Sequence, residues 1–66
     1  MQPKHPDVTV QLTGEDGNAF FIIGKVQRAL RAAGVPNHVV ADYVDEATAG
    51  DYDHLLLTTT QWVNVE

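Results

Sequence analysis

The side chains best suited to metal binding in this chain are three histidines and nine acidic residues, because the sequence contains no cysteine. His54 follows Asp53 directly and lies close to Asp51, and imidazole and carboxylate groups both bind metals. No two histidines have the four-residue spacing of a helical zinc site. Acidic residues before and within a first helical turn are also typical of helix capping. We therefore interpret this cluster as structural and expect neither a metal nor a cofactor.

Catalytic groups are scarce in this sequence. It contains neither cysteine nor serine, so the commonest nucleophiles of acyl transfer are absent. Asp42, Asp45 and Glu46 have the spacing of the polar face of an amphipathic helix, where acidic side chains are normally solvated. A domain of 66 residues also encloses little internal space for a substrate. We expect that the protein is not an enzyme.

The strongest candidate for binding is a cluster in which Phe20 and Phe21 fall outside the apolar stripe of an expected helix. Phe20 lies in the direction of Arg31, whereas Phe21 lies near the directions of Lys25 and Arg28. Aromatic rings beside cationic side chains are common in protein-binding surfaces. The alternative is burial of the rings beneath the strand and the C-terminal segment, which we expect for Phe20 more than for Phe21. We call these five residues the aromatic–basic patch.

The helix that carries this patch is predicted over residues 19–33, where apolar side chains recur with helical spacing. Asn18 is a suitable N-cap at the end of a turn-forming segment. Residues 20–23 are aromatic and β-branched, so a hairpin strand is the alternative there. Gly24 within the helix costs about 1 kcal/mol relative to alanine. Its presence indicates a close approach of another element, with a kink of the helix as the weaker alternative.

The other elements of the first half are predicted from the alternation of apolar and polar side chains and from the positions of the prolines. A strand is predicted over residues 8–12, where apolar and polar side chains alternate. Residues 1–7 contain two prolines and are expected to form a disordered lead-in, so the single globular domain spans residues 8–66. A second helix is predicted to begin with Pro36 at its first position.

The C-terminal part of the chain carries competing signals. Residues 51–61 have a helical spacing of apolar side chains, but the threonines at 58–60 and the segment 62–65 favour a strand. We predict a helix over 51–61 and then a short extended segment that pairs with the first strand, because an unpartnered strand is unstable in water. The fold class is therefore α+β, with an N-terminal strand, three helices and a C-terminal extended segment. The core is expected to contain Val8, Val10, Leu12, Ile22, Ile23, Val26, Leu30, Val40, Tyr43, Val44, Leu55, Leu56 and Trp62.

Charge is distributed unevenly along the chain. Residues 1–34 contain all four basic residues and three acids, whereas residues 35–66 contain six acids and no base. We expect the basic helix of the first half to pack beside the acidic helix of the second, with their charges paired. A net charge of −5 repels phosphate backbones, which argues against nucleic-acid binding.

Three segments carry a resemblance to a known group of proteins. They are VTVQLTGEDGNAF at 8–20, GDYDHLL at 50–56 and WVNVE at 62–66. In this order and at similar spacing they resemble a family of short uncharacterised bacterial and phage-type hypothetical proteins. The resemblance implies a bacterial or phage origin and a self-contained domain. It implies no activity and assigns no functional residue.

These features together predict a small, acidic, soluble and cytoplasmic domain. No apolar run approaches the roughly 20 residues that cross a bilayer, and the N-terminal residues have no signal-peptide pattern. The leading functional hypothesis is a non-catalytic protein-interaction module that binds an unidentified protein, or a second copy of itself, through the aromatic–basic patch. Leu57 also lies off the apolar face of its helix, so the exposure of Phe21 and Leu57 is the discriminating observation.

Two alternative functions remain open from the sequence. One is an anion or small-molecule binder that uses the cationic side chains Lys25, Arg28 and Arg31. The other is an acidic inhibitor or nucleic-acid mimic that presents Asp42, Asp45, Glu46, Asp51 and Asp53 to a basic partner.

Overall fold

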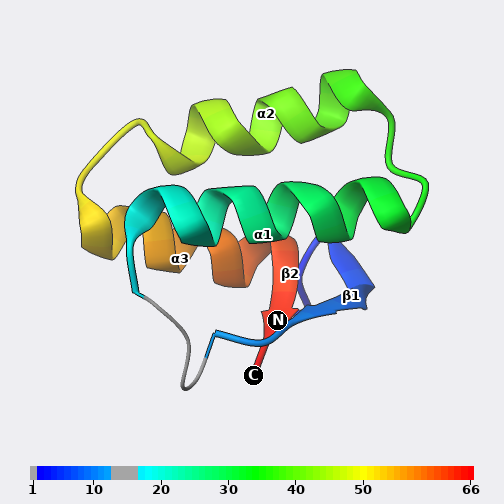
Figure 1. The fold of residues 1–66 in the computed structure, drawn as a ribbon, viewed down its shortest axis with the longest axis horizontal. Helices are drawn as coiled ribbons and strands as arrows, with labels where there is room; N and C mark the ends of the chain where they lie inside the picture. The colour runs from blue at the N-terminus through cyan, green and yellow to red at the C-terminus, as the bar shows by residue number, and fades with distance from the viewer. Residues whose placement is uncertain (1, 13–16) are drawn as a thin grey trace.

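The computed structural model describes residues 2–12 and 17–66. Its elements, in chain order, are β1 (His5–Val10), α1 (Ala19–Ala32), α2 (Asn37–Ala47), α3 (Tyr52–Trp62) and β2 (Val63–Val65). The helices pack together, and the two strands form a small sheet at one side of them (Figure 1). This α+β arrangement and its element order confirm the predicted fold class. Within the described residues, no helix combines the length and apolarity of a membrane span.

The two strands pair in parallel and so join the two ends of the chain. Val10 is aligned with Val65, and the ladder continues beyond the strands, where Leu12 N–H donates to Glu66 O at 2.8 Å. In return, Glu66 N–H donates to Val10 O at 2.9 Å. The predicted pairing of the C-terminal segment with the first strand is therefore confirmed.

The first strand begins at His5, within the segment expected to be a disordered lead-in. Two contacts with the end of α3 account for this earlier start. The His5 ring stacks on the Trp62 ring with centroids 5.6 Å apart, and Lys4 N–H donates to Gln61 O at 2.9 Å. Residues 5–7 thus belong to the sheet, because residues far away in the chain supply their partners.

The α1 segment is helical throughout, so residues 20–23 are not a hairpin strand. The Asn18 side chain accepts the N–H groups of Phe20 at 2.9 Å and Phe21 at 3.3 Å, which confirms it as the N-cap. The turn-forming segment before it includes residues 13–16, which lie outside the described residues. The helix is followed by Gly34 with φ 87°, a conformation that favours glycine.

The helix α3 contains the threonines that favour a strand by propensity. Thr59 donates its hydroxyl to Leu55 O at 2.9 Å, and Thr60 donates to Leu57 O at 2.7 Å. These bonds satisfy the hydroxyl groups inside the helix, as threonine allows. Asp51 is the N-cap of this helix, and its carboxylate accepts His54 N–H at 2.9 Å; the helix extends to Trp62.

In α2, Pro36 is the N-cap rather than the first helical residue that the sequence predicts.

The core lies between the inner faces of the helices and the sheet. Four of the predicted core residues, Leu12, Ile23, Val44 and Leu56, are only partly buried at its margin. The fully enclosed members are Val8, Val10, Ile22, Val26, Leu30, Val40, Tyr43, Ala47, Leu55, Trp62 and Val63. Nine of these were in the predicted core, and the structure adds Ala47 and Val63 to them.

Tyr43 is the largest polar side chain in this core, and its hydroxyl lies 2.8 Å from Thr59 Oγ1. Burial raises the pKa of Tyr43 above its ordinary value of 10.0, and the hydrogen bond with Thr59 only partly offsets this effect. The folded protein therefore favours the protonated phenol. This contribution to stability is complete below pH 10 and is lost as the pH rises through the higher pKa of the folded state.

We expect the free energy of unfolding to fall above about pH 10, and the Tyr43→Phe variant to lack the part of the fall that Tyr43 causes. Urea unfolding at about pH 9 and about pH 11 measures the effect. Tyr52→Phe is the matched control, because it removes the hydroxyl of a tyrosine that is 44% exposed and lies outside the core. Equal losses in the wild type and in Tyr43→Phe would contradict the assignment.

Candidate functional site

The five residues of the aromatic–basic patch all lie on α1, but the structure divides them into two groups. Phe20 is 85% exposed, and Arg28 and Arg31 are also exposed. Phe21 and Lys25 are half-buried on the side of the helix that faces the segment after β1. The two rings thus differ in the sense opposite to expectation, which favoured Phe20 as the more buried ring.

The charged ammonium group of Lys25 contacts other groups of the same domain. Its Nζ donates to Gln11 O at 2.6 Å, and the same atom lies 5.7 Å from the centroid of the Phe21 ring. A lysine held beside an aromatic face and a carbonyl oxygen stabilises the contact between α1 and the end of the first strand. Phe21 and Lys25 therefore contribute to folding and are not a free part of the patch.

The remaining residues form a continuous outward surface, which we call the α1 outer face (Phe20, Gly24, Arg28 and Arg31). Their spacings of three and four residues place them on one side of the helix. A Cβ atom built on Gly24 would meet no atom within 4 Å, so no element of the described chain approaches it closely. Arg28 and Arg31 form no ion pair within residues 2–12 and 17–66.

The expected pairing of the basic helix with the acidic helix does not occur. Although α1 and α2 lie side by side and run in opposite directions (Figure 1), no ion pair joins them in the described part of the chain. Asp42 and Asp45 are exposed on α2, which buries Val40 and Tyr43 on its opposite side. Each helix turns its charges away from the common core, so the two charged surfaces cannot reach each other.

Glu46 has a structural role at the other side of α2. Its Oε1 accepts Trp62 Nε1–H at 3.2 Å, and its Oε2 lies 3.6 Å from Lys4 Nζ. The same Lys4 Nζ lies 4.3 Å from the centroid of the Trp62 ring. These contacts tie the N-terminal segment, α2 and the end of α3 together, so Glu46 is engaged within the fold.

The cluster of His54, Asp51 and Asp53 does not gather around a common point. His54 Nε2 lies 2.8 Å from Glu46 O, and a carbonyl oxygen only accepts, so Nε2 carries a proton. The Asp51 carboxylate caps the helix, as described above. Among the described residues, no group of His and acidic side chains has a metal-binding arrangement.

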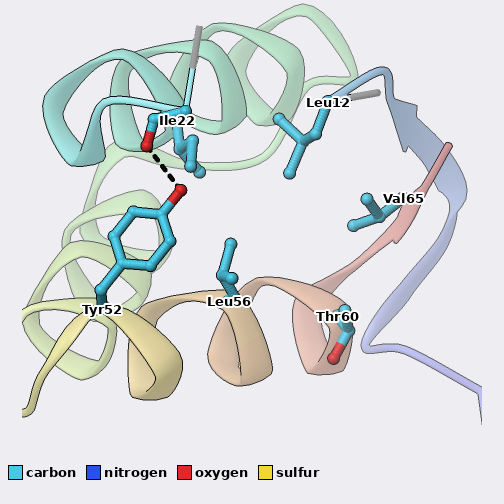
Figure 2. A pocket seen from close by; sticks show the side chains of 7 residues that line it. Leu12, Ile22, Tyr52, Leu56, Thr60 and Val65 are labelled. Carbon is cyan, nitrogen blue, oxygen red and sulfur yellow. Dashed lines mark hydrogen bonds between the residues drawn. The ribbon is translucent and has the colours of Figure 1, made fainter. Parts of the chain in front are cut away.

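Two hollows flank Tyr52, a feature that the sequence analysis missed. The larger has a volume of about 390 Å³ and opens between α1, α3 and the ends of the strands (Figure 2). The Tyr52 hydroxyl donates to Gly17 O across it, and the Thr60 hydroxyl is bonded within α3, so the surface that remains is mainly apolar. Its lining residues are Leu12, Gly17, Ile22, Tyr52, Leu56, Thr60 and Val65.

The smaller hollow has a volume of about 260 Å³ and lies where α1 begins, α2 ends and α3 begins. Phe20, Ile23, Ala47 and Tyr52 are among the residues that line it. Tyr52 is 44% exposed, and its spacing with Leu56 and Thr60 shows a second stripe on α3 that faces the larger hollow.

Leu57 is 57% exposed on α3, whereas Phe21 is half-buried. Of the two side chains whose exposure would indicate a partner surface, Leu57 is therefore exposed and Phe21 is not. Phe20 is the exposed ring instead of Phe21.

Comparisons of the chain with protein-family models, with curated protein sequences and with solved structures find no match.

Proposed function

We propose that this domain is a non-catalytic protein-interaction module whose α1 outer face binds an acidic surface of a partner protein. The observation that carries the proposal is the exposure of Phe20 at 85%, on the same side of α1 as two arginines without an ion pair in the described residues. Burying a phenylalanine side chain contributes about 1.5–3 kcal/mol, which is available only when a partner covers it. Arginine is also enriched where protein interfaces concentrate their binding energy.

Gly24 supports the same surface. A glycine within a helix costs about 1 kcal/mol relative to alanine, and no close contact of the half-buried Gly24 with another described element explains that cost. A glycine between Phe20 and Arg28 allows a partner backbone to approach the helix closely. The close approach expected from the sequence is therefore assigned to another molecule rather than to an element of the same chain.

The geometry of the cations favours protein binding over the capture of a small anion. Lys25 donates to Gln11 O, so it does not converge with Arg28 and Arg31 on one point. The two arginines stand on a convex helix surface, one turn apart, and are exposed. Such an arrangement suits two separate acidic side chains of a partner better than one enclosed ligand.

A capture experiment with matched variants tests this function. The immobilised domain is exposed to a lysate of the cells that produce it, and the retained proteins are quantified by mass spectrometry. We expect Phe20→Ala to reduce the retention of specific partners at least about tenfold, a loss of 1.4 kcal/mol or more. The control is Leu57→Ala, which removes an exposed apolar side chain on α3. An equal loss with Leu57→Ala, or full retention with Phe20→Ala, would contradict the proposal.

Gly24→Gln provides a variant in which folding and binding should change in opposite directions. Glutamine has a higher helix propensity than glycine, and the space beside Gly24 is open, so the free energy of unfolding should rise by about 0.5–1 kcal/mol. The added side chain should nevertheless block the close approach and lower partner retention. Urea unfolding and the same capture assay measure the two effects, and a variant that gains stability and keeps its partners would remove Gly24 from the binding surface.

A further inference from the structure

We infer that the α1 outer face binds the acidic surface of α2 in a second copy of this chain. The inference rests on the proposed function and identifies the partner. We call the partner surface the α2 acidic face (Asp42 and Asp45). Both residues are exposed, and neither carboxylate forms an ion pair or a hydrogen bond with the described residues, although the backbone carbonyl of Asp45 accepts the Thr48 hydroxyl at 3.4 Å. Within the described residues, neighbouring helices thus carry one basic surface and one acidic surface that form no ion pairs.

The two surfaces match in spacing as well as in charge. Arg28 and Arg31 are three residues apart, and so are Asp42 and Asp45. On both helices this spacing corresponds to about 4.5 Å along the axis. Two helices packed in opposite directions therefore form two charge-assisted pairs at once, Arg28 with Asp45 and Arg31 with Asp42. Within one copy these pairs do not form, because both helices direct these residues away from the core.

The same antiparallel alignment also indicates where the exposed Phe20 ring of one copy lies on the other copy. Phe20 precedes Arg28 by eight residues, or about 12 Å along the helix. The equivalent distance beyond Asp45 extends past Ala47, where α2 ends. The smaller hollow opens at this end of α2, and its lining includes Ala47, Tyr52 and the Phe20 of the same copy. The Phe20 ring of the other copy is thus expected to cover the end of α2, close to this hollow.

The association is expected to be weak and reversible. The whole domain exposes only 4152 Å², and a contact between helix faces covers a small part of it, below the area of standard stable interfaces. Each copy also carries a net charge of −5, which opposes association at long range. We expect a dissociation constant of about 0.1 mM. Because salt weakens both the ion pairs and the net repulsion, salt dependence alone does not test the arrangement.

Exchange of the charges provides a decisive test. One variant carries Arg28→Glu and Arg31→Glu, and the other carries Asp42→Arg and Asp45→Arg. Each variant alone should be monomeric in sedimentation velocity, because its two faces have the same sign. An equimolar mixture should form a complex at least about tenfold more tightly than either variant with itself. Circular dichroism of each variant checks the fold, and the single exchanges Arg28→Glu and Asp45→Arg provide a milder pair.

A control separates the specific surface from net charge. Asp53→Arg with Glu66→Arg changes two exposed acids outside α2, so its net charge equals that of the Asp42 and Asp45 variant. It keeps Arg28 and Arg31, so it should bind the Arg28→Glu, Arg31→Glu variant no more tightly than the wild type binds that variant. Binding by this control as tight as that of the Asp42→Arg, Asp45→Arg variant, or monomeric mixtures together with a monomeric wild type at about 1 mM, would overturn the inference. If those mixtures stay monomeric while partner capture still depends on Phe20, the partner is a different protein and the proposed function stands.

Discussion

Replacing Trp62 with alanine is expected to remove a large share of the free energy of unfolding. The Trp62 side chain is 2% exposed, and its ring packs edge-on against Tyr43 with centroids 5.7 Å apart. It also stacks on His5, and its Nε1–H donates to Glu46. Truncation of a buried tryptophan costs about 3–5 kcal/mol. A domain of 66 residues has a total stability of about 3–10 kcal/mol, so this loss is comparable to the whole.

Urea unfolding followed by circular dichroism measures this effect, with Trp62→Phe as the graded variant. Phenylalanine keeps a ring against Tyr43 and removes only the indole N–H and part of the volume, so its cost should be about 1–2 kcal/mol. Leu57→Ala, on the exposed side of the same helix, should change stability by about 0.5 kcal/mol or less. A Trp62→Ala protein with the unfolding midpoint of the wild type would contradict the central position assigned to this ring.

Replacing Val63 with aspartate is expected to have an effect of similar size. Val63 is 0% exposed, although it is the C-cap that follows α3 and the first residue of β2. An aspartate there would bury a carboxylate without a partner, which costs several kcal/mol or forces local unfolding. Because β2 is the only described strand paired with β1, loss of β2 should also release the first strand.

Val65→Asp is the matched control for this substitution, because Val65 lies on the same strand and is 38% exposed. Its carboxylate can reach water, so we expect a loss of about 1 kcal/mol or less. Amide hydrogen exchange supplies a second measurement. In Val63→Asp the amides of Leu12 and Glu66, which bond across the ladder, should lose protection, whereas Val65→Asp should leave them protected. Equal destabilisation by the two substitutions would show that the burial of Val63 is not decisive.

Local pattern was sufficient to predict the helices, because their signals lie within a few residues. The Asn18 and Asp51 side chains cap α1 and α3 through bonds to residues two or three positions away. The burial of Ile22, Val26 and Leu30 follows the helical period read from the sequence. Even Thr59 and Thr60 in α3 obey a local rule, since their hydroxyls donate to carbonyl groups in the preceding turn.

The candidate site was predicted in position but not in composition. The sequence placed an aromatic–basic surface on α1, and the exposed Phe20, Arg28 and Arg31 lie there. The separation of Phe21 and Lys25 from this surface depends on Gln11 O, which accepts the Lys25 Nζ–H. That contact joins a helix to the end of a strand, and helical periodicity contains no information on such a neighbour.

By itself, the sequence determined the helices, the N-cap of α1, most of the core and the α+β class, because capping bonds and helical periodicity act over a few residues. Only the tertiary structure decided where β1 begins, since the partners of Lys4 and His5 are Gln61 and Trp62 at the other end of the chain. It also decided that the acidic and basic helices lie side by side without pairing their charges. The reason is geometric: each helix must bury its apolar stripe in a shared core, and this rotates both charged surfaces toward solvent.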